Sequence, residues 1–370
     1  MRERALRLWG CLVLLVAAMA AAVPIDAQAP ATRWTPPRTA DGHPDLQGTY
    51  DVATITPVER PVEFGNRLIL TNEEAAALEH VEAVRDQKLN ESTTADQERG
   101  APPVGGAKPN PNATYLEKLF EGGGGVVGGY NNFWLAPGSQ VVSVNGQKRS
   151  SIVVDPPDGR VPRMKPEAQR RNTEYLRQAV SPDASEGAAA GPRSAYDNPE
   201  SRPLAERCLL GFGSTSGPPT LPNYFYNNLK QIVQTKDHVM ILVEMVHDAR
   251  IIRMNQPHLP PTIRKWMGDS VGRWEGDTLV VETTNFTSKT QFRGSGEDLK
   301  VTERFTRTGP DTILYRFTVE DPSTWERPWT GEYDWRTTAE QIFEYACHEG
   351  NYALENVLRG ARAGEKAESK

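Results

Sequence analysis

Residues 301–320 read VTERFTRTGPDTILYRFTVE, and this stretch decides the fold. Two alternating segments, 301–307 and 312–320, flank a turn sequence rich in Gly, Pro and Asp. One face of the expected hairpin holds Val301, Glu303, Phe305, Ile313, Tyr315, Phe317 and Val319. The other face consists mostly of threonine and arginine. This period of two predicts an antiparallel strand pair that covers a core on one side and meets water on the other.

Segments of the same kind recur on both sides of this hairpin. We expect strands at about 46–55, 133–135, 141–144, 150–155, 230–235, 238–246, 250–254, 278–284, 329–336 and 341–347. The strands after residue 229 follow one another through short connections, which favours an up-and-down barrel over a sandwich. The fold class that we expect is mainly β, an antiparallel lipocalin-like (calycin-type) barrel with helical and loop insertions.

Helices are expected only in two excursions from the barrel, at about 71–130 and 163–205. The sequence TNEE at 71–74 is a capping box, which predicts a helix that continues to about Leu89. Pro166 begins a second, short and charged helix, because proline is favoured at the first helical position. Helices are too few for the alternating units of a parallel sheet.

The first 28 residues have the features of a secretory signal. Three arginines precede an apolar run at 8–22, and small residues follow the run. The run is too short to span a bilayer comfortably, so we favour cleavage over a membrane anchor. We therefore expect a periplasmic or secreted protein without membrane insertion, with a single barrel domain at 29–370.

The net charge and the cysteine content limit which partners and which cellular compartment are expected. The 370-residue chain has 42 basic and 48 acidic residues, and a net charge of −6 argues against nucleic acid as a partner. Beyond the expected signal the chain keeps two cysteines, Cys208 and Cys347. In an oxidising compartment we expect them to form a disulfide. The glycine-rich match at 123–128 lacks the flanking strand and helix of a dinucleotide site, and we expect no cofactor.

Three histidines stand at strand ends or in loops, which form the rim of a barrel: His247, His258 and His348. We take His247 and His348 as candidate proton carriers, and Asp248 and His258 as candidate substrate-binding residues. The alternative is that each histidine caps a strand or bonds a loop carbonyl. A weaker alternative is a metal site of these three histidines, although their spacing matches no standard metal motif.

Two carboxylates interrupt apolar strand faces and are candidate catalytic groups. Glu303 lies among the apolar residues of the hairpin, and Glu244 interrupts the run at 239–246. A carboxylate inside a barrel needs a partner or a raised pKa. Arg250 or Arg253 is the expected partner for Glu244, and Arg250 also suits an anionic group of a substrate. The alternative is a buried ion pair that only fixes the core.

Aromatic residues crowd the predicted strand at 329–336. Trp329, Tyr333 and Trp335 share one face with Gly331. We take the three aromatic residues as candidate substrate-binding residues, because such a face can stack on a sugar or an aromatic ligand. The alternative is that they pack in the core.

Four blocks of the sequence carry a resemblance to a known family. They read DPPDGR at 155–160, EMVHDAR at 244–250, WMGDSVGRWEGDTLVVETTNF at 266–286 and YACHEGNY at 345–352. Together they resemble a large family of uncharacterised secreted proteins that is abundant in soil bacteria. The resemblance covers nearly all of the chain beyond the expected signal. It implies export and one shared architecture, and it supplies no catalytic residues.

The function that we expect is an exported enzyme that acts on a small sugar-derived or aromatic compound. Elimination or hydrolysis by acid–base chemistry at the barrel mouth suits the residues, because neither reaction needs a redox cofactor or an obvious nucleophile. We expect His247 and His348 to lie within about 10 Å of each other around one cavity. The alternatives are a non-catalytic, lipocalin-like ligand-binding protein of the periplasm and, more weakly, a histidine-ligated metal-binding protein. The oligomeric state stays open.

Overall fold

The computed structural model describes most of the chain beyond the expected signal. The described residues are 34–90, 136–180, 196–202, 204, 206–210, 217–222, 226–288 and 292–368. The elements named below belong to one unit, Pro36–Lys370. The expected signal at 1–28 and the expected strand at 133–135 lie outside the described residues. No helix in the described parts is long and apolar enough to cross a bilayer.

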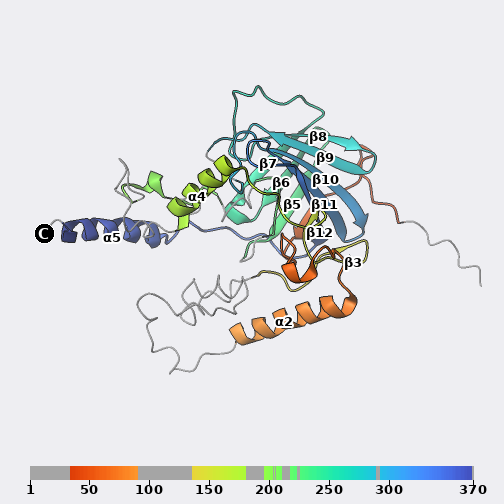
Figure 1. Cartoon of the computed structure of the whole chain (residues 1–370). Coiled ribbons are helices and arrows are strands. Elements are labelled where there is room, and N and C mark those ends of the chain that lie inside the picture. The colour runs from red at the N-terminus through yellow and green to blue at the C-terminus, as the bar shows by residue number, and fades with distance from the viewer. Residues whose placement is uncertain are drawn as a thin grey trace, which may run out of the picture. The chain divides into compact units, whose positions relative to one another are not determined.

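Nine strands close into a barrel (Figure 1). In barrel order they are β1 (Gly48–Asp51), β5 (Leu229–Gln234), β6 (His238–Val243), β7 (Ala249–Met254), β8 (Asp269–Glu275), β9 (Thr278–Thr284), β10 (Lys300–Gly309), β11 (Thr312–Glu320) and β12 (Trp329–Thr337). β12 pairs with β1, so the sheet closes on itself. β4 (Val153–Asp155) adds to the first part of β12, and β2 (Ser143–Val144) pairs with β3 (Gln147–Lys148). The expected mainly β barrel is confirmed.

One strand interface differs from the antiparallel arrangement that we expected. β7 and β8 are parallel, with Ile252 opposite Ser270. Residues 255–268 must therefore run back along the barrel between these two strands. The buried Asp269 holds this return segment, since its carboxylate accepts hydrogen bonds from the Leu259 N–H at 3.0 Å and the Arg253 guanidinium at 2.9 Å. The barrel is mixed, because a local strand pattern does not specify the direction of the neighbouring strand.

The expected strand at 341–347 is wrong. The backbone of this segment bonds to side chains instead of to another strand. The Phe343 N–H donates to Glu244 at 3.5 Å, and the Tyr345 N–H donates to His247 Nδ1 at 3.1 Å. β12, the preceding strand, already has strand partners on both edges, β11 on one and β4 and β1 on the other.

The helices lie outside the barrel strands. They are α2 (Asn72–Asn90), α4 (Pro166–Val180) and α5 (Tyr352–Glu368), with short 3₁₀ turns η1 (Val62–Phe64), η4 (Pro199–Ser201) and η5 (Met245–His247). The capping box of α2 is confirmed, because Thr71 Oγ1 accepts from the Glu74 N–H at 3.1 Å and Glu74 accepts from the Thr71 N–H at 2.8 Å. α4 begins at Pro166 as expected, whereas α5 was not expected.

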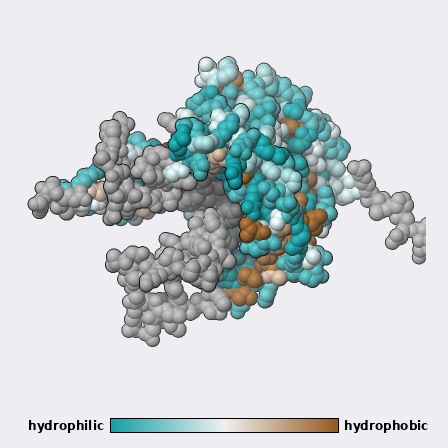
Figure 2. Space-filling view, in the orientation of Figure 1, coloured by the Kyte–Doolittle hydropathy of each residue, from teal (hydrophilic) through white to brown (hydrophobic). Residues whose placement is uncertain are grey.

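The core fills the barrel interior. All seven residues of the predicted hairpin face, Glu303 included, have an exposed fraction of 0 %. The outer face of the barrel is predominantly hydrophilic in the view of Figure 2. The alternation of residues 301–320 therefore identified the buried face correctly.

Candidate functional site

One end of the barrel carries long connections, and we call this end the mouth. The connections at the mouth are 244–248, 285–299 and 321–328. At the other end short turns join the strands, at 235–237, 276–277 and 310–311. Ligands enter barrels where loops leave room and supply side chains, so the mouth is the candidate site.

Residues 217–222, which we call the mouth segment, reach into the barrel interior. Gly217 lies beside Met267, at the mouth end of β8, and residues 218–222 are all buried. The backbone N–H of Thr220 donates to the Tyr315 hydroxyl at 2.9 Å, and its carbonyl accepts from the Tyr333 hydroxyl at 2.8 Å. The mouth segment thus meets the interior tyrosines through backbone groups.

Four interior side chains form a polar group that we call the interior cluster: Arg250, Glu303, Tyr315 and Tyr333. Arg250 Nη1 donates to Glu303 Oε2 at 2.5 Å, and Arg250 Nη2 donates to Glu303 Oε1 at 3.0 Å. The Tyr315 hydroxyl donates to Glu303 Oε1 at 2.8 Å. Glu303 therefore has the buried partner that its position required. The expected pairing of Arg250 or Arg253 with Glu244 is wrong, because Arg250 binds Glu303 and Arg253 binds Asp269.

Burial and charge determine the ionisation of the interior cluster. Burial by itself lowers the pKa of Arg250, but the adjacent Glu303 carboxylate outweighs burial and holds this pKa above its ordinary value. Burial raises the pKa of Tyr315 and the pKa of Tyr333 well above the ordinary value, and Glu303 adds to both shifts. At neutral pH the cluster therefore contains one guanidinium and two protonated phenols.

Lys230 is a second buried polar group at the mouth, and sequence reasoning gave it no role. Its exposed fraction is 0 %, and it pairs with Tyr50 and Val243, which are also buried. Its ammonium donates to the Asn227 carbonyl at 3.5 Å. Burial lowers the pKa of Lys230 to about 7, although Glu244 and Asp51 both act to raise it.

Lys230→Met is expected to stabilise the protein at acidic and neutral pH. The pKa of Lys230 is lower in the folded state than in the unfolded chain, so the folded state binds fewer protons between about pH 7 and 10.5. The cost of burying this lysine is therefore fully present below about pH 7 and disappears as the pH rises through this window. We expect a gain of a few kcal/mol at about pH 6 that vanishes above about pH 10.5.

Urea unfolding at several pH values measures this gain. Lys236→Met, on an exposed turn, is the matched control and should change the free energy of unfolding by less than about 0.5 kcal/mol. A stability difference between wild type and Lys230→Met that does not depend on pH would contradict the lowered pKa.

His247 holds the segment after β12 with both ring nitrogens. Nε2 lies 2.9 Å from the Phe343 carbonyl, and Nδ1 accepts from the Tyr345 N–H. An accepting Nδ1 makes Nε2 the protonated nitrogen, so Nε2 donates to the carbonyl. Val246 and His247 have φ of 64° and 54°, a strained conformation for a β-branched residue such as valine. His247 thus bonds a loop carbonyl, which is the structural alternative considered above.

The other rim candidates lie in different surroundings. His258 bonds Asp269 at 3.1 Å and Glu282 at 3.4 Å, and so helps to hold the return segment. His348 is exposed, three residues after Tyr345, and its proximity to His247 stays a prediction. The Asp248 carbonyl accepts from the Val243 N–H at 2.8 Å. In the described parts of the chain, no three His, Cys, Asp or Glu side chains are arranged to hold a metal ion.

The aromatic candidates of β12 lie on one face, as predicted, and pack in the core. Trp329, Tyr333 and Trp335 have exposed fractions of 0 %. The Trp329 ring stacks on Phe292 with centroids 6.0 Å apart, and the Trp335 ring lies 5.0 Å from that of Tyr315. These residues therefore pack in the core, which is the alternative considered for them in the sequence analysis. Tyr333 also contacts the mouth segment through its hydroxyl.

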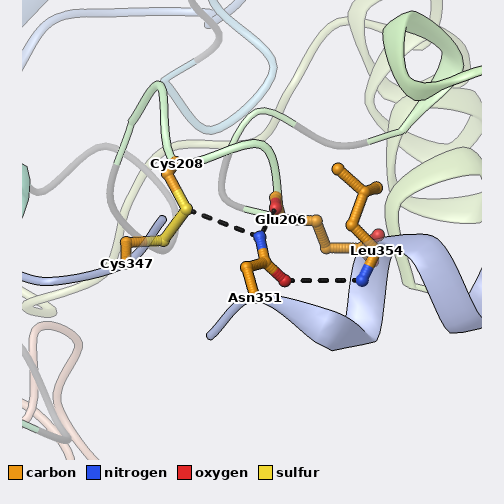
Figure 3. Close-up of a disulfide and its surroundings, with 5 residues drawn as sticks. All are labelled: Glu206, Cys208, Cys347, Asn351 and Leu354. Carbon is orange, nitrogen blue, oxygen red and sulfur yellow. Dashed lines mark hydrogen bonds between the residues drawn. A yellow bond between two sulfur atoms is a disulfide. The ribbon is translucent and has the colours of Figure 1, made fainter. Parts of the chain in front are cut away.

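The disulfide ties the chain before the mouth segment to the chain before α5 (Figure 3). Cys208 and Cys347 are bonded, with Cα atoms 5.7 Å apart, as expected from the cysteine count. The Asn351 amide donates to the Glu206 carbonyl at 3.0 Å and to Cys208 Sγ at 3.6 Å. Its oxygen accepts from the Leu354 N–H at 3.4 Å, so one asparagine joins the start of α5 to residues 206–208.

No protein-family model, no curated protein and no solved structure matches this chain.

Proposed function

We propose that the protein binds a small polar molecule at the mouth of its barrel, in the place of the mouth segment. The observation that carries the proposal is the pair of hydrogen bonds between Thr220 and the buried Tyr315 and Tyr333. Within the mouth segment, the N–H and the carbonyl of Thr220 are the hydrogen-bond partners of these two hydroxyls. A ligand that offers one donor and one acceptor at similar spacing makes the same two bonds.

The charge of the interior cluster favours a ligand without large net charge. Arg250 and Glu303 form a bidentate pair, so their charges compensate within the cluster. The sequence suggested that Arg250 binds an anionic group of a substrate, but such a group would have to compete with the Glu303 carboxylate for the guanidinium. Aromatic rings lie next to the hydroxyls, with Tyr315 and Tyr333 centroids 5.4 Å apart. A neutral sugar-derived or phenolic compound combines suitable hydroxyls with an apolar face.

Acid–base turnover of the bound molecule is the second candidate function. The hydrogen bond from Tyr315 to Glu303 favours it, because the phenol lies between the carboxylate and the position of the ligand. The Tyr315 oxygen can take a proton from the ligand while its own proton moves to Glu303, and the reverse transfer returns a proton to the leaving group, as an eliminating or hydrolytic enzyme requires. His247, with both nitrogens bonded to the backbone, is not needed for this transfer.

Export and a lipocalin-like (calycin-type) kind of barrel belong to the same proposal. The apolar segment at 8–22 and the disulfide support a periplasmic or secreted location. The consecutive antiparallel order of β8 to β12 supports a calycin-type relationship, and the four sequence blocks support membership in the family of secreted soil-bacterial proteins.

Wild type is expected to bind a ligand about 3- to 10-fold more tightly than an analogue that lacks the group bonded to one hydroxyl, since that hydrogen bond contributes about 1 kcal/mol. Tyr315→Phe and Tyr333→Phe each remove one hydroxyl and should abolish this preference, because the free protein loses its bond to Thr220 at the same time. A panel of neutral sugars, phenolic compounds and amides, followed by tryptophan fluorescence and thermal shift, identifies the ligand. Tyr352→Phe is the matched control, because Tyr352 is exposed on α5, and it should bind like wild type. Product analysis of each binding compound then separates an enzyme from a binding protein. Phe variants that keep the wild-type preference for the ligand over its analogue would refute this site.

A further inference from the structure

The surroundings of Lys230 differ from those of other lysines. Lys148, Lys265 and Lys300 lie on the surface or near it, and carboxylates lie 3.0, 3.3 and 2.7 Å from their ammonium nitrogens. Lys230 is fully buried, and in the described parts of the chain no carboxylate oxygen lies within 4.0 Å of its nitrogen. An ammonium has three hydrogens to donate, whereas the long bond to Asn227 uses one. A buried amine without a close counter-charge is favoured in its neutral, nucleophilic form.

Two carboxylates stand farther from this amine, one on each side of β5. Glu244 follows β6, and its side chain accepts from the Leu229 N–H at 3.1 Å. Asp51 ends β1, beside Leu229 in the register. Both act on Lys230 through their charge, so a cation that forms on this nitrogen is attracted by both. The site therefore suits a reaction in which an uncharged amine becomes a charged product.

We propose that Lys230 is a reactive amine that forms an imine with the carbonyl group of a small aldehyde or ketone. The nitrogen lone pair bonds to the carbonyl carbon, and the carbonyl oxygen takes up the protons that the nitrogen loses. That oxygen leaves as water while the C=N bond forms. A further proton on the nitrogen gives the iminium ion, whose charge Glu244 and Asp51 stabilise. The iminium withdraws electrons from the neighbouring carbon, which eases loss of a proton or cleavage of a C–C bond there.

This inference deepens the proposed function and rests on it for the entry of a small molecule. Lys230 is the second residue of β5, at the mouth end of the barrel. Iminium formation supports dehydration and C–C cleavage of hydroxylated carbonyl compounds. The substrate class is therefore a small hydroxy-aldehyde or hydroxy-ketone, which agrees with a sugar-derived ligand.

Reductive trapping tests the proposal on the purified full-length mature protein. Propionaldehyde, which is neutral, and glyoxylate, which is anionic, are each added with cyanoborohydride, and the labelled lysines are identified by peptide mass mapping. At about pH 7 an amine with a pKa near 7 has a roughly thousandfold larger neutral fraction than an ordinary lysine. We expect at least one probe to label Lys230 at least about tenfold faster than the exposed Lys236. The rate at Lys230 should level off above about pH 8, whereas the rate at Lys236 should keep rising.

Two variants make the outcome specific. Lys230→Met should lose the preferred label, and Glu244→Gln should move the rate profile of Lys230 to lower pH, because it removes one carboxylate that raises the pKa. If Lys230→Met does not fold, the peptide mass map of the wild-type protein still shows whether Lys230 is labelled faster than Lys236. Labelling of Lys230 at or below the rate of Lys236 with both probes overturns the proposal.

The ligand panel separates this inference from the proposed function. Preferred labelling of Lys230 without an effect of the Tyr315 and Tyr333 variants on binding supports the amine and rejects the tyrosine site. Ligand binding that depends on the tyrosines, together with an unreactive Lys230, supports the tyrosine site and rejects the reactive amine.

Discussion

Arg250→Met is expected to lower the free energy of unfolding by about 3–5 kcal/mol, since it leaves a buried carboxylate without its cationic partner. Glu303 has an exposed fraction of 0 %, and Arg250 supplies two of its hydrogen bonds. Among the residues that the structure describes, the Tyr315 hydroxyl is then the remaining donor to Glu303. Glu303→Met should cost a similar amount, because it leaves the guanidinium buried and unpaired.

The double variant distinguishes the effect of losing the whole ion pair from the effect of leaving one charge unpaired. Arg250→Met with Glu303→Met removes both charges, so we expect it to be more stable than either single variant by about 2 kcal/mol or more. Urea unfolding at neutral pH measures all four proteins. Arg273→Met is the control, because Arg273 pairs with Glu275 on the surface and should cost less than about 1 kcal/mol. An Arg250→Met protein within about 1 kcal/mol of wild type would contradict the buried pair.

Loss of the disulfide is expected to lower the free energy of unfolding by about 2–5 kcal/mol, because the bond closes a long loop in the unfolded chain. Cys208 and Cys347 are separated by 139 residues. Chemical unfolding with and without a reductant measures the effect. The double variant Cys208→Ser with Cys347→Ser is the control, and its stability should not respond to the reductant. Free thiols at these two positions in unfolded, unreduced protein would show that the bond is absent.

The hairpin at 301–320 shows what a sequence pattern can predict. Its two strands have one wet face, so the period of two and the burial of side chains coincide, and every residue on the predicted face is buried. The capping box at 71–74 is equally local, because both of its hydrogen bonds join residues three apart. These two features depend on neighbouring residues alone, and both were predicted correctly.

The segment at 341–347 shows where such patterns fail. Its residues suit a strand, but a strand also needs a free partner, and β12 already has three. The turn that contains Glu244 and His247 bonds its backbone instead. The parallel pairing of β7 and β8 was also missed, because the direction of β8 depends on the path of residues 255–268 and not on a local pattern.

The candidate site was predictable only in part. Glu303 stood out as a carboxylate on an apolar face, and its buried partner follows from physical chemistry. Lys230 did not stand out, because both faces of the strand at 229–234 mix apolar and polar residues. The contact of Tyr315 with Thr220 joins residues 95 positions apart, and no local pattern encodes it.

Amide hydrogen exchange at Thr220, with and without a ligand from the panel, tests the central claim most directly. In the free protein this N–H donates to Tyr315 inside the barrel, so its exchange should be slow. A ligand that takes the place of the mouth segment releases this N–H, and we predict exchange at least about tenfold faster at saturating ligand. Unchanged or slower exchange at Thr220 under the same conditions would contradict a ligand that takes the place of the mouth segment.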